Sequence, residues 1–288
     1  MNATAPLRFG VSEFSTWPWS FEEDLDAYSR LGVDVIEVCE AKLDPARAEE
    51  QLDAVRGTGL VAESMQPRLH SVFPDVPRPH PVEPSERSAR LRASIELAGR
   101  AAPGTTLVTI TGAAPDGNFR EAFEVATRQY MALADVAADQ GVRLALEPLN
   151  PVLIMNADTF VCSIPDALRI VEAVDRPSFG IWVDVWHVWQ DPAVLERIRA
   201  CGDRIFGVHV SDWHTPRHFE DRAMIGRGEI PLAEMLRAFY GAGYRGAYTL
   251  ELFSRLELPG SLWAGDLADL IVDNRAGLED AWRRAMAA

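Results

Sequence analysis

Short aliphatic and β-branched segments alternate along the whole chain with longer segments that have a helical pattern. Eight short segments are typical of buried strands: 7–12, 34–38, 60–65, 106–111, 142–147, 179–184, 204–211 and 247–252. Each interval between them can hold a helix, and regular alternation of strands with helices is typical of a parallel sheet. The pattern therefore predicts eight β-α units.

The way in which these units are arranged follows from the segment after the first strand. An open, doubly wound sheet usually has a glycine-rich phosphate-binding turn there. This chain has SEFSTWPW instead, without a GxGxxG pattern. The length of 288 residues is close to the ~250 residues typical of a closed barrel. We therefore predict an α/β fold, a (β/α)₈ TIM barrel, with residues 1–288 as a single domain.

Three local signals predict where helices begin. Ser20 is followed three residues later by Glu23, the spacing of a capping box. Asp44-Pro45 predicts a second helix start, because proline is favoured at the first helical position. A long helix is expected over 118–140, and the glycine that follows it is expected to end it.

The segment 67–84 interrupts the alternation. Six of the 19 prolines fall within it. A long loop without secondary structure inside a compact domain is usually functional or mobile. We interpret 67–84 as a possible lid over a site, and an ordered surface connection is the alternative.

The charge balance excludes several classes of partner. Lys and Arg number 28 and Asp and Glu number 43, so the net charge is −15. Nucleic acid and anionic membranes prefer basic surfaces, so we expect neither as a partner. There is no apolar run of about 18 residues and no signal-like N-terminus. Three widely spaced cysteines do not indicate a disulfide framework. We therefore expect a cytoplasmic protein.

Four polar residues at the ends of predicted strands are the candidates for chemistry. They are Glu147, Asp184, His209 and Glu251. Catalytic residues of such barrels lie at the C-terminal ends of strands. A satisfied salt bridge can explain any one of these residues alone, but three carboxylates meeting there would repel one another without a cation. The set suits a divalent ion, Mn²⁺ most closely, with Mg²⁺, Co²⁺ or Zn²⁺ as alternatives.

Other residues are candidates for contact with a substrate. Trp17, Trp186 and Trp213 follow predicted strands, where flat rings either stack on sugar faces or seal the top of the barrel. Glu37 lies in the second predicted strand. Arg222 lies in an arginine-containing loop after the seventh strand, which either holds an anionic group or is solvated.

Several short motifs carry a resemblance to a known family. They are EPLN at 147–150, DVWH at 184–187, HVSD at 209–212, GRGEI at 226–230 and LEL at 250–252. With these motifs the chain resembles the xylose isomerase-like TIM-barrel superfamily, in the branch of sugar phosphate isomerases and epimerases. The resemblance implies that the same four residues are metal ligands. It also implies that Glu147 and Glu251 exchange a proton with the substrate on opposite faces, and that His187 binds a substrate oxygen.

The resemblance therefore implies a metal-dependent isomerase or epimerase of a small sugar-like carbonyl compound, acting through a metal-bound enediolate. Two departures weaken a ketose 3-epimerase assignment: Leu153 stands where such enzymes have a second glutamate, and Thr215 where they have an arginine. A lyase of the inosose or dehydroshikimate dehydratase type is the alternative on the same scaffold. A barrel without activity is a third possibility, and a homo-oligomer would be in keeping with this scaffold.

Overall fold

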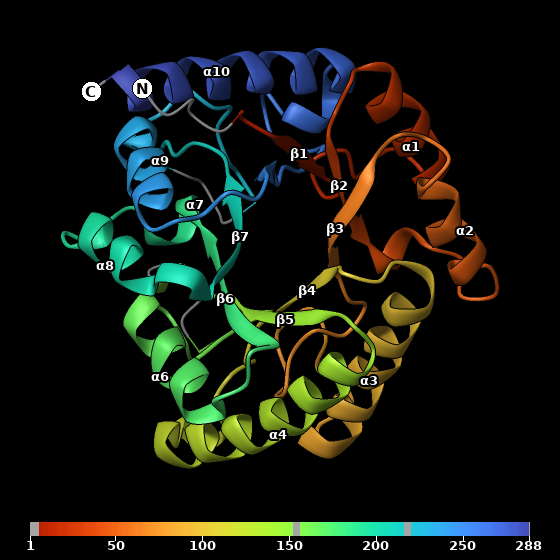
Figure 1. Cartoon of the computed structure of the whole chain (residues 1–288), viewed down its shortest axis with the longest axis vertical. Coiled ribbons are helices and arrows are strands. Elements are labelled where there is room, and N and C mark those ends of the chain that lie inside the picture. Colours follow the sequence, from red (N-terminus) through yellow and green to blue (C-terminus); the bar gives the residue numbers. More distant parts are fainter. Residues whose placement is uncertain (1–5, 152–155, 216–219, 288) are drawn as a thin grey trace.

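Eight parallel strands form a closed barrel in the order of the sequence, and helices surround it (Figure 1). The computed structural model describes residues 6–151, 156–215 and 220–287. The strands are β1 (Phe9–Ser12), β2 (Val35–Cys39), β3 (Val61–Gln66), β4 (Thr106–Thr109), β5 (Arg143–Leu146), β6 (Phe179–Asp184), β7 (Ile205–Val210) and β8 (Tyr248–Leu250). The single-domain (β/α)₈ TIM barrel is thus confirmed.

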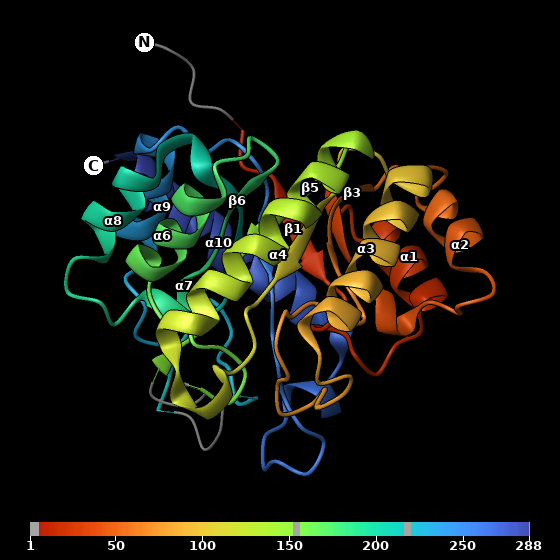
Figure 2. The ribbon, with the colours of Figure 1, turned by 90° about the horizontal axis from the view of Figure 1, so that it is seen from below.

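The helices follow the strands in the predicted alternation. They are α1 (Phe21–Arg30), α2 (Ala48–Val55), α3 (Pro84–Ala101), α4 (Phe119–Asp139), α6 (Ile164–Val174), α7 (Val185–Val188), α8 (Val194–Cys201), α9 (Leu232–Gly241) and α10 (Leu267–Ala287). Val11 of β1 pairs with Leu250 of β8, which closes the barrel. The loops after β3 and β8 extend from one end of the barrel, and the described chain ends lie at the other (Figure 2).

The helix signals are confirmed in two cases and wrong in one. The Glu23 N–H donates to Ser20 Oγ at 3.2 Å and the Ser20 N–H to Glu23 Oε2 at 2.7 Å, which completes the capping box. The long helix is α4, within one residue of the expected ends at each side. The helix expected from Asp44 begins only at Ala48. The Asp44 carboxylate accepts the Ala46 N–H at 2.9 Å, and this local bond forms a turn instead.

Trp182 is the largest member of a small hydrophobic cluster that also contains Val108, Ala145 and the partly buried Phe206. Trp182 of β6 is buried and packs edge-on against the His209 ring, with 4.9 Å between ring centroids. A Cβ at Gly207, on the neighbouring strand, would lie 1.9 Å from the Trp182 ring. Glycine at 207 therefore leaves the space for Trp182, which supports His209 from below.

Candidate active site

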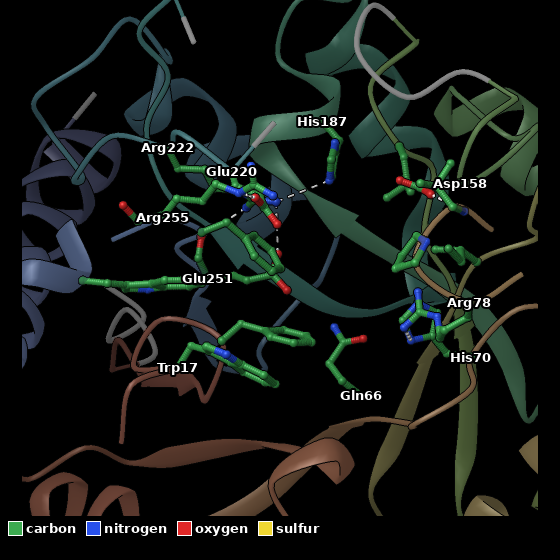
Figure 3. A pocket seen from close by; sticks show the side chains of 18 of the residues that line it. Trp17, Gln66, His70, Arg78, Asp158, His187, Glu220, Arg222, Glu251 and Arg255 are labelled. Carbon is green, nitrogen blue, oxygen red and sulfur yellow. Dashed lines mark hydrogen bonds and ion pairs between the residues drawn. The ribbon is translucent and has the colours of Figure 1, made fainter. Parts of the chain in front are cut away.

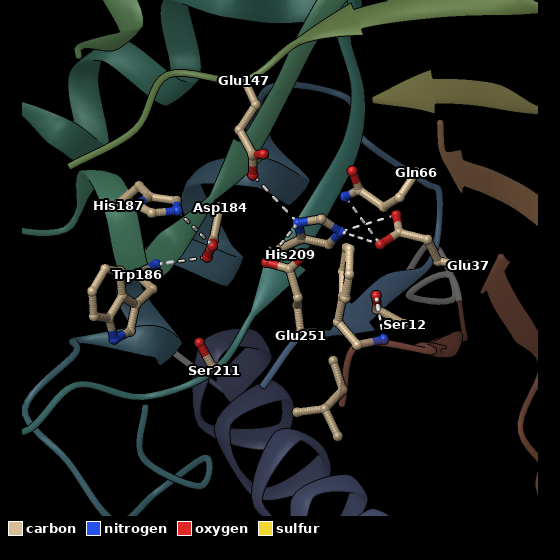
Figure 4. A network of polar contacts seen from close by, with 12 residues as sticks. Ser12, Glu37, Gln66, Glu147, Asp184, Trp186, His187, His209, Ser211 and Glu251 are labelled. Atoms are coloured by element: carbon tan, nitrogen blue, oxygen red, sulfur yellow. Dashed lines mark hydrogen bonds and ion pairs between the residues drawn. The ribbon is translucent and has the colours of Figure 1, made fainter. Parts of the chain in front are cut away.

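Four polar side chains meet at the C-terminal end of the barrel (Figure 4). Asp184 ends β6 and His209 lies in β7, while Glu147 and Glu251 come directly after β5 and β8. Each is buried and offers one ligand atom, and these atoms all lie within 4.8 Å of one another. Parallel strands bring their ends together, so residues up to 104 positions apart in the sequence become neighbours (251 minus 147).

His209 lies among three carboxylates. Its Nδ1 is 3.3 Å from both Glu147 Oε1 and Glu251 Oε2, and its Nε2 is 2.9 Å from Glu37 Oε1. Burial works against the charged imidazolium, but the negative charges of Glu251 and Glu37 outweigh it and raise the pKa of His209 well above its usual value. Nδ1 therefore faces the cluster, and Glu37 holds the opposite nitrogen.

Arg222 supplies a second positive charge to the cluster. Its Nη1 lies 2.7 Å from Asp184 Oδ2 and its Nη2 3.2 Å from Glu251 Oε2. The guanidinium is buried, and it packs 4.9 Å from the ring centroids of both Trp186 and Phe253. This arginine reaches the cluster from the loop after β7, seven residues beyond Thr215.

The carboxylates respond differently to this environment. Burial raises the pKa of Glu251 to about 8, and burial likewise raises the pKa of Glu147. Burial acts in the same direction on Asp184, but the charges of Arg222 and His209 and the hydrogen bond from the Trp186 N–H together outweigh it and lower the pKa of that carboxyl. The acids of the cluster are thus costly to ionise together unless a cation is close to them.

The residues of the cluster fit a divalent ion. Asp184 Oδ2 is fully buried and, apart from its ion pairs, has no well-directed hydrogen bond among the described residues. Three carboxylates and one imidazole nitrogen are donors that Mn²⁺, Mg²⁺, Co²⁺ and Zn²⁺ accept. Glu147, Asp184, His209 and Glu251 could therefore hold such an ion.

A cavity of about 930 Å³ opens above the cluster (Figure 3). Of the residues expected to contact substrate or exchange a proton, five line it: Glu147, Glu251, His187, Arg222 and Trp17. Asp184 and His209 lie beneath its floor. The cavity is therefore polar at its base, where Gln66 of β3 also faces it.

His187 is held in a defined orientation at the edge of the cavity. The Asn150 N–H donates to its Nδ1 at 3.0 Å, and its Nε2 lies 3.5 Å from Asp184 Oδ2. Burial lowers the pKa of His187 to about 3, so the ring is neutral. With Nδ1 accepting, the ring proton is on Nε2, the nitrogen beside Asp184.

Three residues expected to bind substrate do not line the cavity. Trp186 and Trp213 are buried and pack against each other at 4.6 Å, and Trp186 supports the Arg222 guanidinium. Glu37 lies under His209 and accepts the Ser64 hydroxyl at 2.7 Å. Each of these three side chains points into the core and not into the cavity. Each therefore affects the site only through the residues that it contacts.

The structure adds wall residues that the strand ends alone did not single out. They are Phe14, Pro18, Asp158, Glu220, Phe253, Arg255 and Leu256, among others. His70, Val76 and Arg78 also line the cavity, and they lie in the segment 67–84 that the sequence singled out. Phe14 and Phe253 lie within three residues of the ends of β1 and β8. This closeness to a strand end could have identified them from the sequence. Leu153, one of the two departures from the ketose 3-epimerase pattern, lies outside the described residues.

The proline-rich segment forms one side of the cavity. It connects β3 to α3, which begins at Pro84. Val76, Pro77 and Arg78 line the cavity. Below them the buried Asp75 pairs with Arg78 at 3.0 Å and with the buried Arg87 of α3 at 3.2 Å. Ion pairs thus tie this part of the segment to the first turns of α3.

A closed (β/α)₈ barrel with a buried carboxylate–histidine cluster at its C-terminal end is the class that the fold and the site define. The family model described as Xylose isomerase-like TIM barrel matches residues 25–280, and the chain belongs to this family. The resemblance noted in the motifs is thereby confirmed.

Curated relatives match part of the chain. L-ribulose 3-epimerase of Methylomonas sp. (strain DH-1) is 30% identical over 42% of this chain and 39% of its own length. Inosose isomerase of Halalkalibacterium halodurans is 33% identical over 42% of this chain and 43% of its own length. A 3-dehydroshikimate dehydratase of Pseudomonas putida is 29% identical over 42% of this chain and 19% of its own length. These matches thus span about two fifths or less of each relative's length.

Solved structures match nearly the whole chain. Protein SMc04130 of Sinorhizobium meliloti 1021 superposes with a TM-score of 0.81 at 25% identity, covering 96% of this chain and 98% of that one. The IOLI protein with a binding zinc atom has a TM-score of 0.80 at 20% identity, covering 98% and 100%. Separately, no helix among the described residues has the length and apolarity needed to cross a membrane.

Proposed function

We propose that the protein is a metal-dependent isomerase or epimerase of a small sugar-like carbonyl compound. One observation carries the proposal: Glu147 and Glu251 line the cavity on either side of His209 Nδ1, each 3.3 Å from it. Two carboxylates that face one substrate volume can remove a proton from one face of a carbon and return it from another. Relatives named as an epimerase and an isomerase support this reading.

We propose Mn²⁺ as the ion, with Mg²⁺, Co²⁺ or Zn²⁺ as alternatives; the zinc atom in the IOLI structure supports a divalent ion in general. A bound ion at Glu147, Asp184, His209 and Glu251 would polarise the substrate carbonyl and make the adjacent C–H acidic. Proton transfer and the orientation of the substrate are then the roles of the side chains around the cavity.

The protein groups around the cavity have separate roles in this proposal. Glu147 and Glu251 take and return the proton at the carbon next to the carbonyl. The Nε2–H of His187 and the guanidinium of Arg222 donate to substrate oxygens and fix the orientation of the substrate. Gln66 lines the base of the same cavity and can bind a further hydroxyl group.

A dehydratase is the second candidate, supported by the relative named 3-dehydroshikimate dehydratase. The same base would remove the proton, and a β-hydroxyl group would leave. The product would be a conjugated enone, which absorbs in the ultraviolet. The two candidates therefore differ in a directly measurable product.

The test is a screen of the Mn²⁺-loaded protein against ketoses, ketose phosphates and inososes in D₂O. We expect deuterium incorporation next to the carbonyl, observed by NMR. Glu147→Gln and Glu251→Gln should each lose it while keeping the fold. Glu63→Gln is the matched control, because Glu63 lies in β3 but outside the cavity lining. Wild-type exchange in either cavity variant would contradict the mechanism, and a rising enone absorbance would favour the dehydratase.

Three further expectations stay predictions. They are the role of 67–84 as a lid, a homo-oligomeric assembly and a cytoplasmic location. The cavity lining by Val76, Pro77 and Arg78 supports a contact between this loop and a substrate.

A further inference from the structure

Three aromatic rings form a continuous wall from the floor of the cavity to its mouth. The ring of Phe253 lies 5.0 Å from that of Phe14, with a tilt of 36°. Phe14 stacks on Trp17 at 5.8 Å, with 27° between the ring planes. All three residues line the cavity. We call Phe14, Trp17 and Phe253 the aromatic wall.

The inner end of this wall touches the polar cluster. Arg222 Cζ lies 4.9 Å from the centroid of Phe253, and the same guanidinium pairs with Glu251. A ligand that reaches Glu251 with a polar group therefore meets Phe253 next. Phe14 contacts Phe253 and Trp17 contacts Phe14, so the ligand meets these two rings after Phe253; Figure 3 shows Trp17 at the cavity.

The outer end of the wall is exposed. Trp17 is 42% exposed and Leu256, also at the cavity, is 60% exposed. Both residues line the cavity, so their exposed apolar surface adjoins the space that a ligand would occupy. The direct continuity with the polar floor favours a ligand that has one polar and one apolar end.

The size of the cavity agrees with such a ligand. Its volume of about 930 Å³ lies at the upper end of the ~300–1,000 Å³ of sites for drug-sized molecules. A free sugar ring on the floor would leave the aromatic wall uncovered. Phe14 and Trp17 both line the cavity, and aromatic groups pack against such rings in offset-stacked or edge-to-face arrangements.

We propose that the site accepts a sugar-like carbonyl compound that bears an aromatic substituent, with the substituent packed on the aromatic wall. The inference rests on the proposed function for the polar half of the ligand. It adds the substrate class: an aryl-substituted compound in preference to a free sugar.

The experiment compares two ketoses that differ only in the substituent. Calorimetry would give the dissociation constants of 1-O-benzyl-D-fructose and 1-O-methyl-D-fructose for the Mn²⁺-loaded protein. We expect the benzyl compound to bind about tenfold more tightly, as an aromatic contact and buried area predict. Trp17→Ala should remove most of this preference, and Trp17→Phe should keep most of it.

Phe119→Ala is the matched control. Phe119 is 44% exposed, close to the value for Trp17, but it does not line the cavity. The benzyl preference should be unchanged in this variant. Equal binding of the two ketoses, no binding of either, or a preference that survives Trp17→Ala would overturn the inference. A change in sedimentation of Trp17→Ala without a change in binding would also overturn it and assign the wall to a subunit contact.

The outcome is separable from that of the proposed reaction. A benzyl preference that depends on Trp17, found together with no deuterium exchange, would support this inference and reject the reaction. Exchange on an unsubstituted sugar without any benzyl preference would support the reaction and reject the inference.

Discussion

Arg222 Nη1 lies 2.7 Å from Asp184 Oδ2, so a fixed positive charge touches one of the four residues suited to an ion. Like charges repel strongly at such distances in a buried site. We expect Arg222→Gln to bind Mn²⁺ about tenfold more tightly, and to be less stable without the ion because two acids lose their counter-charge.

Electron paramagnetic resonance of free Mn²⁺ would measure this affinity. Arg227→Gln is the control, since Arg227 is an exposed arginine of the same loop that does not line the cavity. An unchanged or weaker affinity in Arg222→Gln would show that Arg222 does not compete with the ion.

Glu37 should set the metal affinity from beneath the cluster. It accepts from His209 Nε2 at 2.9 Å, which leaves Nδ1 facing Glu147 and Glu251. Partners of this kind typically change metal affinity by about 10–100-fold. We expect Glu37→Gln to weaken Mn²⁺ binding by a factor in this range, measured by calorimetry.

Ser64 offers a graded comparison for that result. Its hydroxyl donates to Glu37 Oε2 at 2.7 Å, so Ser64→Ala removes one bond and keeps the carboxylate. Ser64→Ala should therefore weaken Mn²⁺ binding less than Glu37→Gln does. Equal effects of the two variants would point to a general loss of packing instead.

Asp212 should hold the loop that carries Arg222. Its carboxylate accepts the backbone N–H groups of Trp213, Gly226, Gly228 and Ile230 at 2.8–3.0 Å. Asp212→Ala leaves these donors without their partner, and we expect a loss of about 3 kcal/mol or more in the free energy of unfolding. Urea denaturation would measure it. Asp212→Asn retains an acceptor oxygen and should lose less; an equal loss would contradict this account.

Glu13 should make stability depend on pH. Burial and the neighbouring Asp24 carboxylate raise the pKa of Glu13 well above its usual value. A group whose pKa is higher in the folded than in the unfolded state stabilises the fold fully at pH values below its pKa in the unfolded state. This contribution is lost as the pH rises through its pKa in the folded state. Glu13→Gln resembles the protonated form, so it should be more stable than the wild type at pH 8, by about 1 kcal/mol or more.

Urea denaturation at pH 5.5 and pH 8 would test this difference, which should shrink at the lower pH. Glu124→Gln on the exposed face of α4 is the control and should show no such trend. A Glu13→Gln variant that is less stable than the wild type at pH 8 would show that the ionised carboxylate is needed.

The sequence-based prediction of the fold was accurate because its signals are local. Apolar runs separated by capped helices identify strands wherever they occur, and β6 has the predicted bounds, Phe179–Asp184. The helix start near Asp44 was wrong, because an aspartate followed by proline suits a turn as well as a helix. Only the surrounding packing distinguishes the two.

The sequence by itself determined the barrel and brought Glu147, Asp184, His209 and Glu251 to one end of it, since parallel strands of a barrel end together. Tertiary structure alone decided which residues touch them. Glu37 reaches His209 across 172 positions, and Arg222 reaches Asp184 from a loop. Trp186 turns into the core instead of the cavity. Loop paths and side-chain directions depend on packing between distant segments, which no local pattern in the sequence encodes.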